Sequence, residues 1–123
     1  MNFDESNKAI YLQIYDLICD SILRGDYREE ERIPSVRECA AAMEVNSNTA
    51  MRTYERLQNK GYIYNKRGIG FFMAPGAKEK IMAERSEELM DKVLPPIFQR
   101  MIYLGITPEK LAEAYENYIN SNK

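Results

Sequence analysis

The sequence predicts a mainly α-helical chain with one small β-hairpin, arranged as an N-terminal winged helix-turn-helix followed by a short two-helix tail. Three observations lead to this prediction. Apolar residues recur at helical spacing over residues 9–24. Two capped helical segments joined by a very short connection follow over residues 35–61. Two β-rich runs separated by a polar, glycine-containing turn come next, over residues 62–73.

The length of 123 residues and the 45% hydrophobic content are those of a small globular protein rather than a large enzyme. Histidine, the commonest general base and metal ligand, is absent. The carboxylates are spread among basic residues, so we expect no enzyme activity, no metal and no cofactor. No stretch approaches the ~20 apolar residues that span a bilayer. We therefore expect a cytoplasmic protein with no membrane partner.

The two cysteines, Cys19 and Cys39, lack the close pairing of zinc or redox motifs. Cysteine is among the most frequently buried residue types. Both are therefore predicted to be small buried apolar residues rather than a disulfide.

The first helix is predicted over residues 9–24, with Gly25 at the position of a C-terminal cap. The residues predicted to form its apolar face are Ile10, Ile14, Leu17, Ile18, Ile22 and Leu23. The charged segment 26–32 is predicted to be a loop. Ile33 is expected to be extended, because a residue that precedes proline avoids the helical region.

Two further helices are predicted to form the helix-turn-helix. Ser35 with Glu38 three residues later is a capping box, so the second helix begins there and ends near Met43. After a short connection, Asn46 caps a third helix that ends at Gly61. The positions of the third helix predicted to face the core are Ala50, Tyr54 and Leu57.

The β-rich runs at residues 62–64 and 71–73 are predicted to form a hairpin, which is the wing, and the polar segment 65–70 is its turn. Alternation places one aromatic residue of each strand pair toward the core. We favour core packing over a stacking platform for single-stranded nucleic acid. Pro75 and Gly76 then mark the predicted boundary between the winged helix-turn-helix domain, residues 1–75, and a helical tail, residues 76–123.

The tail is predicted to be helical, interrupted at Pro95 and Pro96, with a last helix that is capped by Thr107 and starts at Pro108. Its roughly 48 residues are too few to form a core alone. Its apolar faces therefore need a partner to be buried. The residues of the tail expected to make this contact, and so the candidates for dimerisation, are Leu94, Ile97, Phe98, Met101, Leu111, Tyr115 and Tyr118.

A compact basic patch is predicted around the third helix and the wing. The whole chain has a net charge of -2, but residues 46–67 contain five basic residues and one acidic residue. A basic patch beside a helix-turn-helix is typical of nucleic-acid binding, in which the third helix enters the major groove of duplex DNA. The residues of this helix expected to point outward are Ser47, Asn48, Met51, Arg52 and Glu55.

Each candidate on the third helix has a chemical use at DNA. Asn48 can pair with the adenine edge, and Met51 can pack on a thymine methyl group. Ser47 and Thr49 can bond a base or a phosphate, and Arg52 can bind guanine or phosphate. The alternative is that this polar helix start is only a solvated face.

Three residues outside that helix are also candidates. Arg37, in the first turn of the second helix, is placed to bind phosphate beside the groove, with a surface ion pair to Glu38 as the alternative. Lys66 and Arg67 can bind phosphate or enter the minor groove, and Gly68 lets the backbone approach DNA closely. The alternative is that Gly68 and Gly70 are there only because the turn requires positive φ angles.

Four separated motifs then occur in one order: YLQIY at residues 11–15, IPSVRE at 33–38, VNSNT at 45–49 and GYI at 61–63. Over residues 9–74 the sequence resembles the GntR family of bacterial transcription regulators. The resemblance implies DNA contacts by Arg37, by the start of the third helix and by Gly68. Met51 departs from the basic or amide residue that some members have there. The full set of predicted DNA-binding residues is Ser35, Arg37, Asn46, Ser47, Asn48, Thr49, Met51, Arg52, Lys66, Arg67 and Gly68.

The short tail, with IFQRMIYL at residues 97–104 and GITPE at 105–109, is similar to that of the YtrA-like group of this family. This resemblance implies a two-helix dimerisation tail, an inverted-repeat DNA operator as partner, and repression, often of transporter genes. The residues identify no small-molecule effector.

Two other functions stay open at this point. The first is a winged-helix module that binds another protein and exposes an apolar face on the third helix. The second is a metabolite sensor with a ligand site between the tails of two subunits, for which Phe98, Tyr103, Tyr115 and Tyr118 are the candidate lining.

Overall fold

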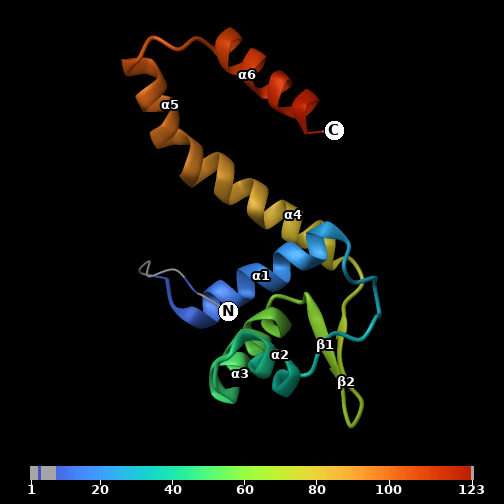
Figure 1. Cartoon of the computed structure of the whole chain (residues 1–123). Coiled ribbons are helices and arrows are strands. Elements are labelled where there is room, and N and C mark those ends of the chain that lie inside the picture. Colours follow the sequence, from blue (N-terminus) through green and yellow to red (C-terminus); the bar gives the residue numbers. More distant parts are fainter. Residues whose placement is uncertain (1–2, 4–7, 123) are drawn as a thin grey trace. The chain divides into compact units, whose positions relative to one another are not determined.

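The computed structural model describes residue 3 and residues 8–122 and confirms the predicted fold class (Figure 1). The elements in chain order are α1 (Ile10–Arg24), α2 (Val36–Met43), α3 (Ser47–Asn59), β1 (Ile63–Lys66), β2 (Gly70–Met73), α4 (Ala77–Glu88), the π-helical segment η1 (Leu89–Val93), α5 (Leu94–Tyr103) and α6 (Pro108–Ser121). The chain forms two compact units, Met1–Ala83 and Glu84–Lys123, which are described separately.

Helix α1 and the loop after it follow the sequence prediction. The helix ends at Gly25, whose φ of 86° is the left-handed value expected of a glycine cap. The loop then runs beside β2, where the Ile33 N–H donates to the Phe71 carbonyl at 2.9 Å and the Met73 N–H donates to the Glu31 carbonyl at 2.9 Å. The predicted extended residue Ile33 is thus bonded to the hairpin.

The helix-turn-helix is fixed by two local caps. The Ser35 hydroxyl accepts from the Glu38 N–H, and the Glu38 carboxylate accepts from the Ser35 N–H, each at 3.0 Å, so the predicted capping box of α2 is confirmed. The side-chain oxygen of Asn46 accepts from the Thr49 N–H at 2.9 Å and caps α3. The turn between the helices passes through Glu44 in the left-handed region, with a φ of 57°.

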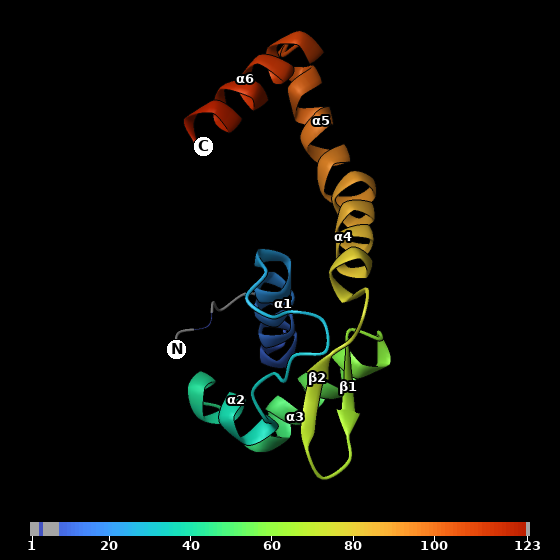
Figure 2. The same ribbon diagram turned by 90° about the vertical axis from the view of Figure 1, so that its right-hand side faces the viewer.

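The core of the first unit lies where α1 and α2 both pack against α3 (Figure 2). The predicted inward residues Ala50, Tyr54 and Leu57 are all buried. Cys19 and Cys39 are buried, as predicted, and no disulfide joins them. Their burial gives them a packing role.

Thr53 is a buried polar residue of α3, and the sequence pattern did not single it out. Its hydroxyl donates to the Tyr11 carbonyl of α1 at 2.7 Å. This bond satisfies the buried hydroxyl and ties α3 to α1.

The hairpin pairs Ile63 with Met73 and Tyr64 with Phe72 in antiparallel register. Ile63 and Met73 are buried in the core, whereas the rings of Tyr64 and Phe72 stack with centroids 5.8 Å apart on the other face. Tyr62 is also buried and Phe71 packs against the core, so one aromatic residue of each run faces the core, as predicted. Tyr64 and Phe72 are the aromatic pair of the wing that lies away from the core.

Helix α4 extends the first unit beyond the hairpin. Ala77 and Ile81 are buried in the same cluster as α1 and α3. The compact unit consequently runs to Ala83, past the proline at residue 75.

The predicted interruption of the tail helix at Pro95 and Pro96 takes a different form in the structure. Helical structure continues from α4 through η1 into α5, and the prolines lie in the first turn of α5. The Leu94 N–H donates to the Leu89 carbonyl, five residues earlier. A proline ring clashes with the carbonyl four residues before it. A π-helical turn widens the backbone there, so the helix passes the prolines without a break.

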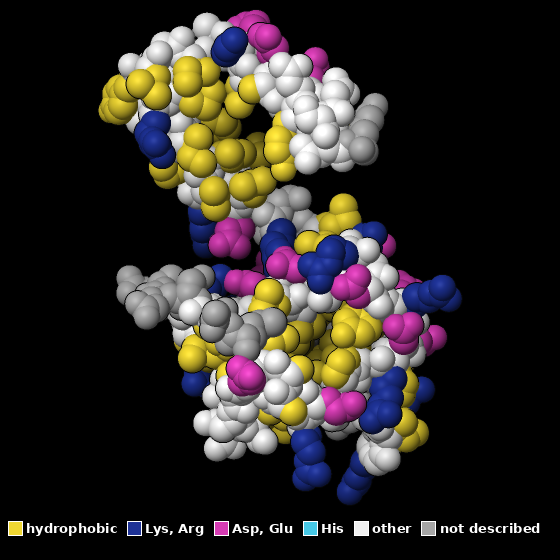
Figure 3. All heavy atoms as spheres, viewed as in Figure 1, with side chains coloured by type: hydrophobic (Ala, Val, Ile, Leu, Met, Phe, Trp, Pro, Cys, Tyr) yellow, Lys and Arg dark blue, Asp and Glu magenta, His cyan; other side chains and the backbone are white. Residues whose placement is uncertain are grey.

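In the second unit, α6 turns back from the end of α5 and begins at the predicted cap, where the Thr107 hydroxyl accepts from the Lys110 N–H at 3.1 Å. Neither α5 nor α6 has a buried residue. Hydrophobic side chains gather on the sides of these helices that face each other (Figure 3). They line a hollow of about 370 Å³. No helix of the described chain is long and apolar enough to cross a membrane.

Candidate nucleic-acid interface

The start of α3 presents a polar face to solvent. Ser47, Asn48 and Arg52 are exposed, and Met51 is 40% exposed. The opposite side of the same helix is buried, so the predicted division of α3 into an inward and an outward face is confirmed. Among the residues that the structure describes, the side chains of Ser47 and Asn48 have no hydrogen-bond partner. Both are therefore available to an external ligand.

Asn46 and Thr49 are engaged with each other. Besides the backbone bond, the Thr49 hydroxyl donates to the Asn46 side-chain oxygen at 3.2 Å. This pair fixes the first turn of α3, from which Ser47 and Asn48 project. The unpaired N–H groups and the macrodipole of a helix N-terminus also favour an anion such as phosphate nearby.

Arg37 is exposed in the first turn of α2, and the ion pair weighed against a DNA contact does not form. The carboxylate of Glu38 accepts from the Ser35 N–H instead, and this bond and the one with the Ser35 hydroxyl lower the pKa of Glu38. Within residue 3 and residues 8–122, Arg37 has no ion-pair partner. Its guanidinium is thus accessible to phosphate.

Two arginine–tyrosine stacks join α3 to α1. The guanidinium carbon of Arg52 lies 4.0 Å from the centre of the Tyr11 ring, and that of Arg56 lies 5.0 Å from the centre of the Tyr15 ring. The sequence prediction missed these pairs. The matching spacing of four residues within each helix is the pattern that indicates them. Stacking restrains the exposed Arg52, so contact with an anion would cost this side chain less rotamer freedom.

The wing presents two basic residues at its tip. The Lys66 ammonium lies 4.7 Å from the centre of the Phe72 ring, and the Ile69 N–H donates to the Lys66 carbonyl at 2.9 Å and closes the turn. Gly68 has a φ of 80°, and no atom lies within 4 Å of the position where a Cβ would stand. The turn therefore requires glycine for its φ and also leaves its backbone open to a close approach.

Helices α2 and α3 and the tip of the wing lie at the same end of the first unit, and Lys and Arg side chains project from it in Figure 3. We call this face the α3–wing surface. The name covers the predicted DNA-binding residues of these elements and of the loop before α2: Ser35, Arg37, Asn46, Ser47, Asn48, Thr49, Met51, Arg52, Lys66, Arg67 and Gly68. Among the described residues, no group of histidine, cysteine and carboxylate side chains is placed to hold a metal.

A helix-turn-helix with a polar α3 start and a basic wing defines a DNA-binding regulator. Comparison with known proteins gives the same class: residues 10–73 match the family model "Bacterial regulatory proteins, gntR family". The chain belongs to the GntR family of bacterial transcription regulators, which are not enzymes.

Relatives of similar length extend the similarity into the tail. The uncharacterized HTH-type transcriptional regulator YhcF of Bacillus subtilis is 36% identical over 93% of this chain and 93% of its own length. The HTH-type transcriptional repressor YtrA of the same organism is 31% identical over 88% of this chain and 82% of its own. A GntR-family regulator from Bacteroides thetaiotaomicron has a crystal structure that matches with a TM-score of 0.79 and 49% identity, over 93% of this chain and all of that one (100%).

Proposed function

We propose that this regulator acts in the bacterial cytoplasm as a homodimeric repressor that binds an inverted-repeat operator. The observation that supports this proposal most strongly is the α3–wing surface. Its helix start is polar and exposed, Arg37 is exposed on the preceding helix α2, and the tip of the basic wing lies at the same end of the unit. Major-groove recognition by a winged helix-turn-helix needs such an arrangement.

Base recognition is assigned to Ser47, Asn48 and Thr49, with Met51 against a thymine methyl group. Arg37 and Arg52 bind phosphates beside the groove. Asn46 and Ser35 hold the two helix starts through their caps, and their remaining hydrogen-bond donors face the phosphate backbone.

The wing supplies sequence-independent affinity. Lys66 and Arg67 contact phosphate or the minor groove, and the Gly68 backbone approaches the duplex closely. These contacts form whatever the base sequence of the DNA, so they raise the affinity for any duplex, and α3 determines which site is bound.

Dimerisation is assigned to the tail, with residues 1–75 as the DNA-binding domain and residues 76–123 as the dimerisation domain. The exposed fraction is 68% for Ile102, 66% for Tyr115 and 68% for Tyr118. Apolar surface of this extent in one short unit is typical of an interface with another subunit. The predicted contacts are Leu94, Ile97, Phe98, Met101, Leu111, Tyr115 and Tyr118.

The alternatives fit these observations less well. A protein-binding module would expose an apolar face on α3, yet Met51 is its one exposed large apolar residue. A ligand site in the tail would enclose its lining, but the apolar side chains of α5 and α6 stay largely open. Burial against a second copy accounts for them better.

The experiment is the selection of bound fragments from a random duplex pool by the full chain at a stated salt concentration. We expect recovered sites to share an inverted repeat whose half-sites lie about one helical turn, or a multiple of it, apart. A pool that shows no enriched sequence would rule out operator recognition. A single, unrepeated half-site would rule out the dimer.

A further inference from the structure

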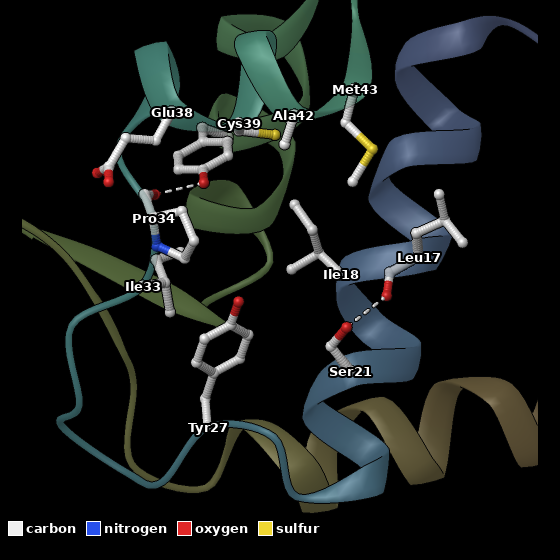
Figure 4. Close-up of a pocket in the computed structure, with 11 residues that line it drawn as sticks. Leu17, Ile18, Ser21, Tyr27, Ile33, Pro34, Glu38, Cys39, Ala42 and Met43 are labelled. Atoms are coloured by element: carbon white, nitrogen blue, oxygen red, sulfur yellow. Dashed lines mark hydrogen bonds between the residues drawn. The ribbon is translucent and has the colours of Figure 1, made fainter. Parts of the chain in front are cut away.

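A second feature of the first unit is a pocket of about 350 Å³ between α1, α2 and the loop that joins them (Figure 4). Its floor is formed by three buried residues, Ile33, Cys39 and Tyr54. Leu17 and Ile18 of α1 and Met43 of α2 form apolar walls. The volume lies within the range of small-molecule sites, roughly 300–1,000 Å³.

The Ser21 and Tyr54 hydroxyls at this pocket already donate to the Leu17 and Pro34 carbonyls, so Tyr27 and Glu38 are the polar residues that restrict what it can hold. The Tyr27 hydroxyl points toward the middle of the lining residues and has no hydrogen-bond partner among residues 8–122. Burial and the charge of Asp26 raise the pKa of this phenol, so it stays protonated and acts as a donor. Glu38 is the single charged residue of the lining, and no lysine or arginine lines the pocket.

These groups define the chemistry of a ligand. Apolar walls favour a hydrocarbon or aromatic body, and the Tyr27 hydroxyl favours one hydrogen-bond acceptor. The Glu38 carboxylate points away from the middle of the pocket and no cation lines it, so an anion would lose its hydration with no charge to pair with, which disfavours acidic and phosphorylated molecules.

The pocket adjoins the elements that form the α3–wing surface. Helices α1 and α2 pack mainly against α3, and the pocket occupies the space between them. Tyr54 of α3 forms part of its floor and donates through its hydroxyl to the carbonyl of Pro34, next to the Ser35 cap. A molecule in the pocket therefore touches the helix that holds Arg37 and the loop that leads into it.

We propose that this pocket binds an uncharged, largely apolar small molecule with one hydrogen-bond acceptor, and that its binding strengthens operator binding. The second part rests on the proposed function. The pocket exists only when α2 lies where the structure has it, so a ligand that binds the pocket favours that position of α2. The same position of α2 sets Arg37 beside α3. Ligand and operator then favour the same arrangement. Each raises the affinity for the other by the same factor.

The binding test is calorimetric titration of the full chain with 2-naphthol, which is neutral at pH 7, and with the anion 2-naphthoate. We expect 2-naphthol to bind and 2-naphthoate to bind much more weakly. Tyr27→Phe should weaken 2-naphthol binding roughly two- to tenfold, the affinity that one neutral hydrogen bond provides. Ala42→Phe places a ring in the pocket and should abolish binding.

Ala41→Phe is the matched control, because Ala41 is an exposed neighbour on the same helix and does not line the pocket. It should bind 2-naphthol as the unaltered protein does. If Ala42→Phe also binds normally, or if the unaltered protein binds neither probe, the site is wrong. Equal binding of naphthol and naphthoate would overturn the assigned ligand class.

Coupling is tested by measuring operator affinity with and without saturating 2-naphthol. We expect 2-naphthol to raise the operator affinity of the unaltered protein roughly fivefold or more, since fivefold is the lower end of usual coupling between two sites. It should leave the operator affinity of Ala42→Phe unchanged. An unchanged operator affinity despite bound probe would overturn the coupling alone. Failure to select any operator would refute the proposed function, whereas probe binding would still support the pocket.

Discussion

Replacement of Asn48 by alanine separates base recognition from general DNA affinity. Asn48 is exposed and its side chain bonds to no described residue, so Asn48→Ala removes no contact that stabilises the fold. If its amide pairs with an adenine, the loss is about 1–3 kcal/mol of discrimination, or roughly five- to 150-fold in relative affinity. The loss should fall on one base pair of each half-site and leave the preference elsewhere unchanged.

Lys66→Ala is the matched comparison, because Lys66 is exposed and lies at the tip of the wing. Its ammonium rests over the Phe72 ring, and we expect the substitution to keep the hairpin register, which pairs the two strands through their backbones. A lost phosphate contact should weaken binding to all sequences alike. It should also reduce the slope of log affinity against log salt by about 0.9 per subunit.

The assay is fluorescence anisotropy with the selected operator and with versions that carry one altered base pair, at three salt concentrations. Asn48→Ala is expected to flatten the preference at one position without a change in salt slope. Lys66→Ala is expected to keep the whole preference profile. Indistinguishable profiles for the two variants would refute the division of roles between α3 and the wing.

Three further predictions concern the cap, the wing turn and the tail. Asn46→Ala removes the cap of α3 and should lower the free energy of unfolding by about 1 kcal/mol in urea denaturation. Asn59→Ala, at the exposed end of the same helix, should change the free energy of unfolding little. Equal effects of the two substitutions would contradict the cap. Gly68→Ala should lower the free energy of unfolding by about 1–2 kcal/mol, because φ at this residue is positive, and should also weaken operator binding. Unchanged stability and unchanged operator affinity would show that neither the φ nor a close approach to DNA requires glycine here. Phe98→Glu should convert the dimer to a monomer by light scattering without loss of helical circular dichroism, and an unchanged dimer would place the interface elsewhere.

Much of the first unit was predictable because its signals are local. The capping box of Ser35 and Glu38 and the cap at Asn46 depend only on residues three positions apart, and the structure contains both. The inward and outward faces of α3 follow from helical periodicity alone. These features together place Ser47 and Asn48 on the exposed surface.

The features that the sequence missed depend on how elements meet. The stacks of Arg52 on Tyr11 and Arg56 on Tyr15 exist because α1 crosses α3. The matching four-residue spacing indicates which side chains can pair, but neither helix specifies that the two cross. The pocket beside Tyr27 likewise arises from the spacing of α1, α2 and a loop.

The prolines of the tail illustrate a different limit. Proline predicts a disturbance of the helix, but it does not specify whether the chain breaks or widens. Here the π-helical segment before Pro95 absorbs the clash, so α4 and α5 stay continuous.

Sequence-specific recognition by α3 is tested most directly by competition at fixed salt between the selected operator and the same duplex with both half-sites scrambled at constant base composition. We predict that the scrambled duplex competes at least about 10³-fold less well, the lower end of usual specificity ratios. Equal competition by the two duplexes would contradict operator recognition, and would leave the α3–wing surface as a general DNA-binding face.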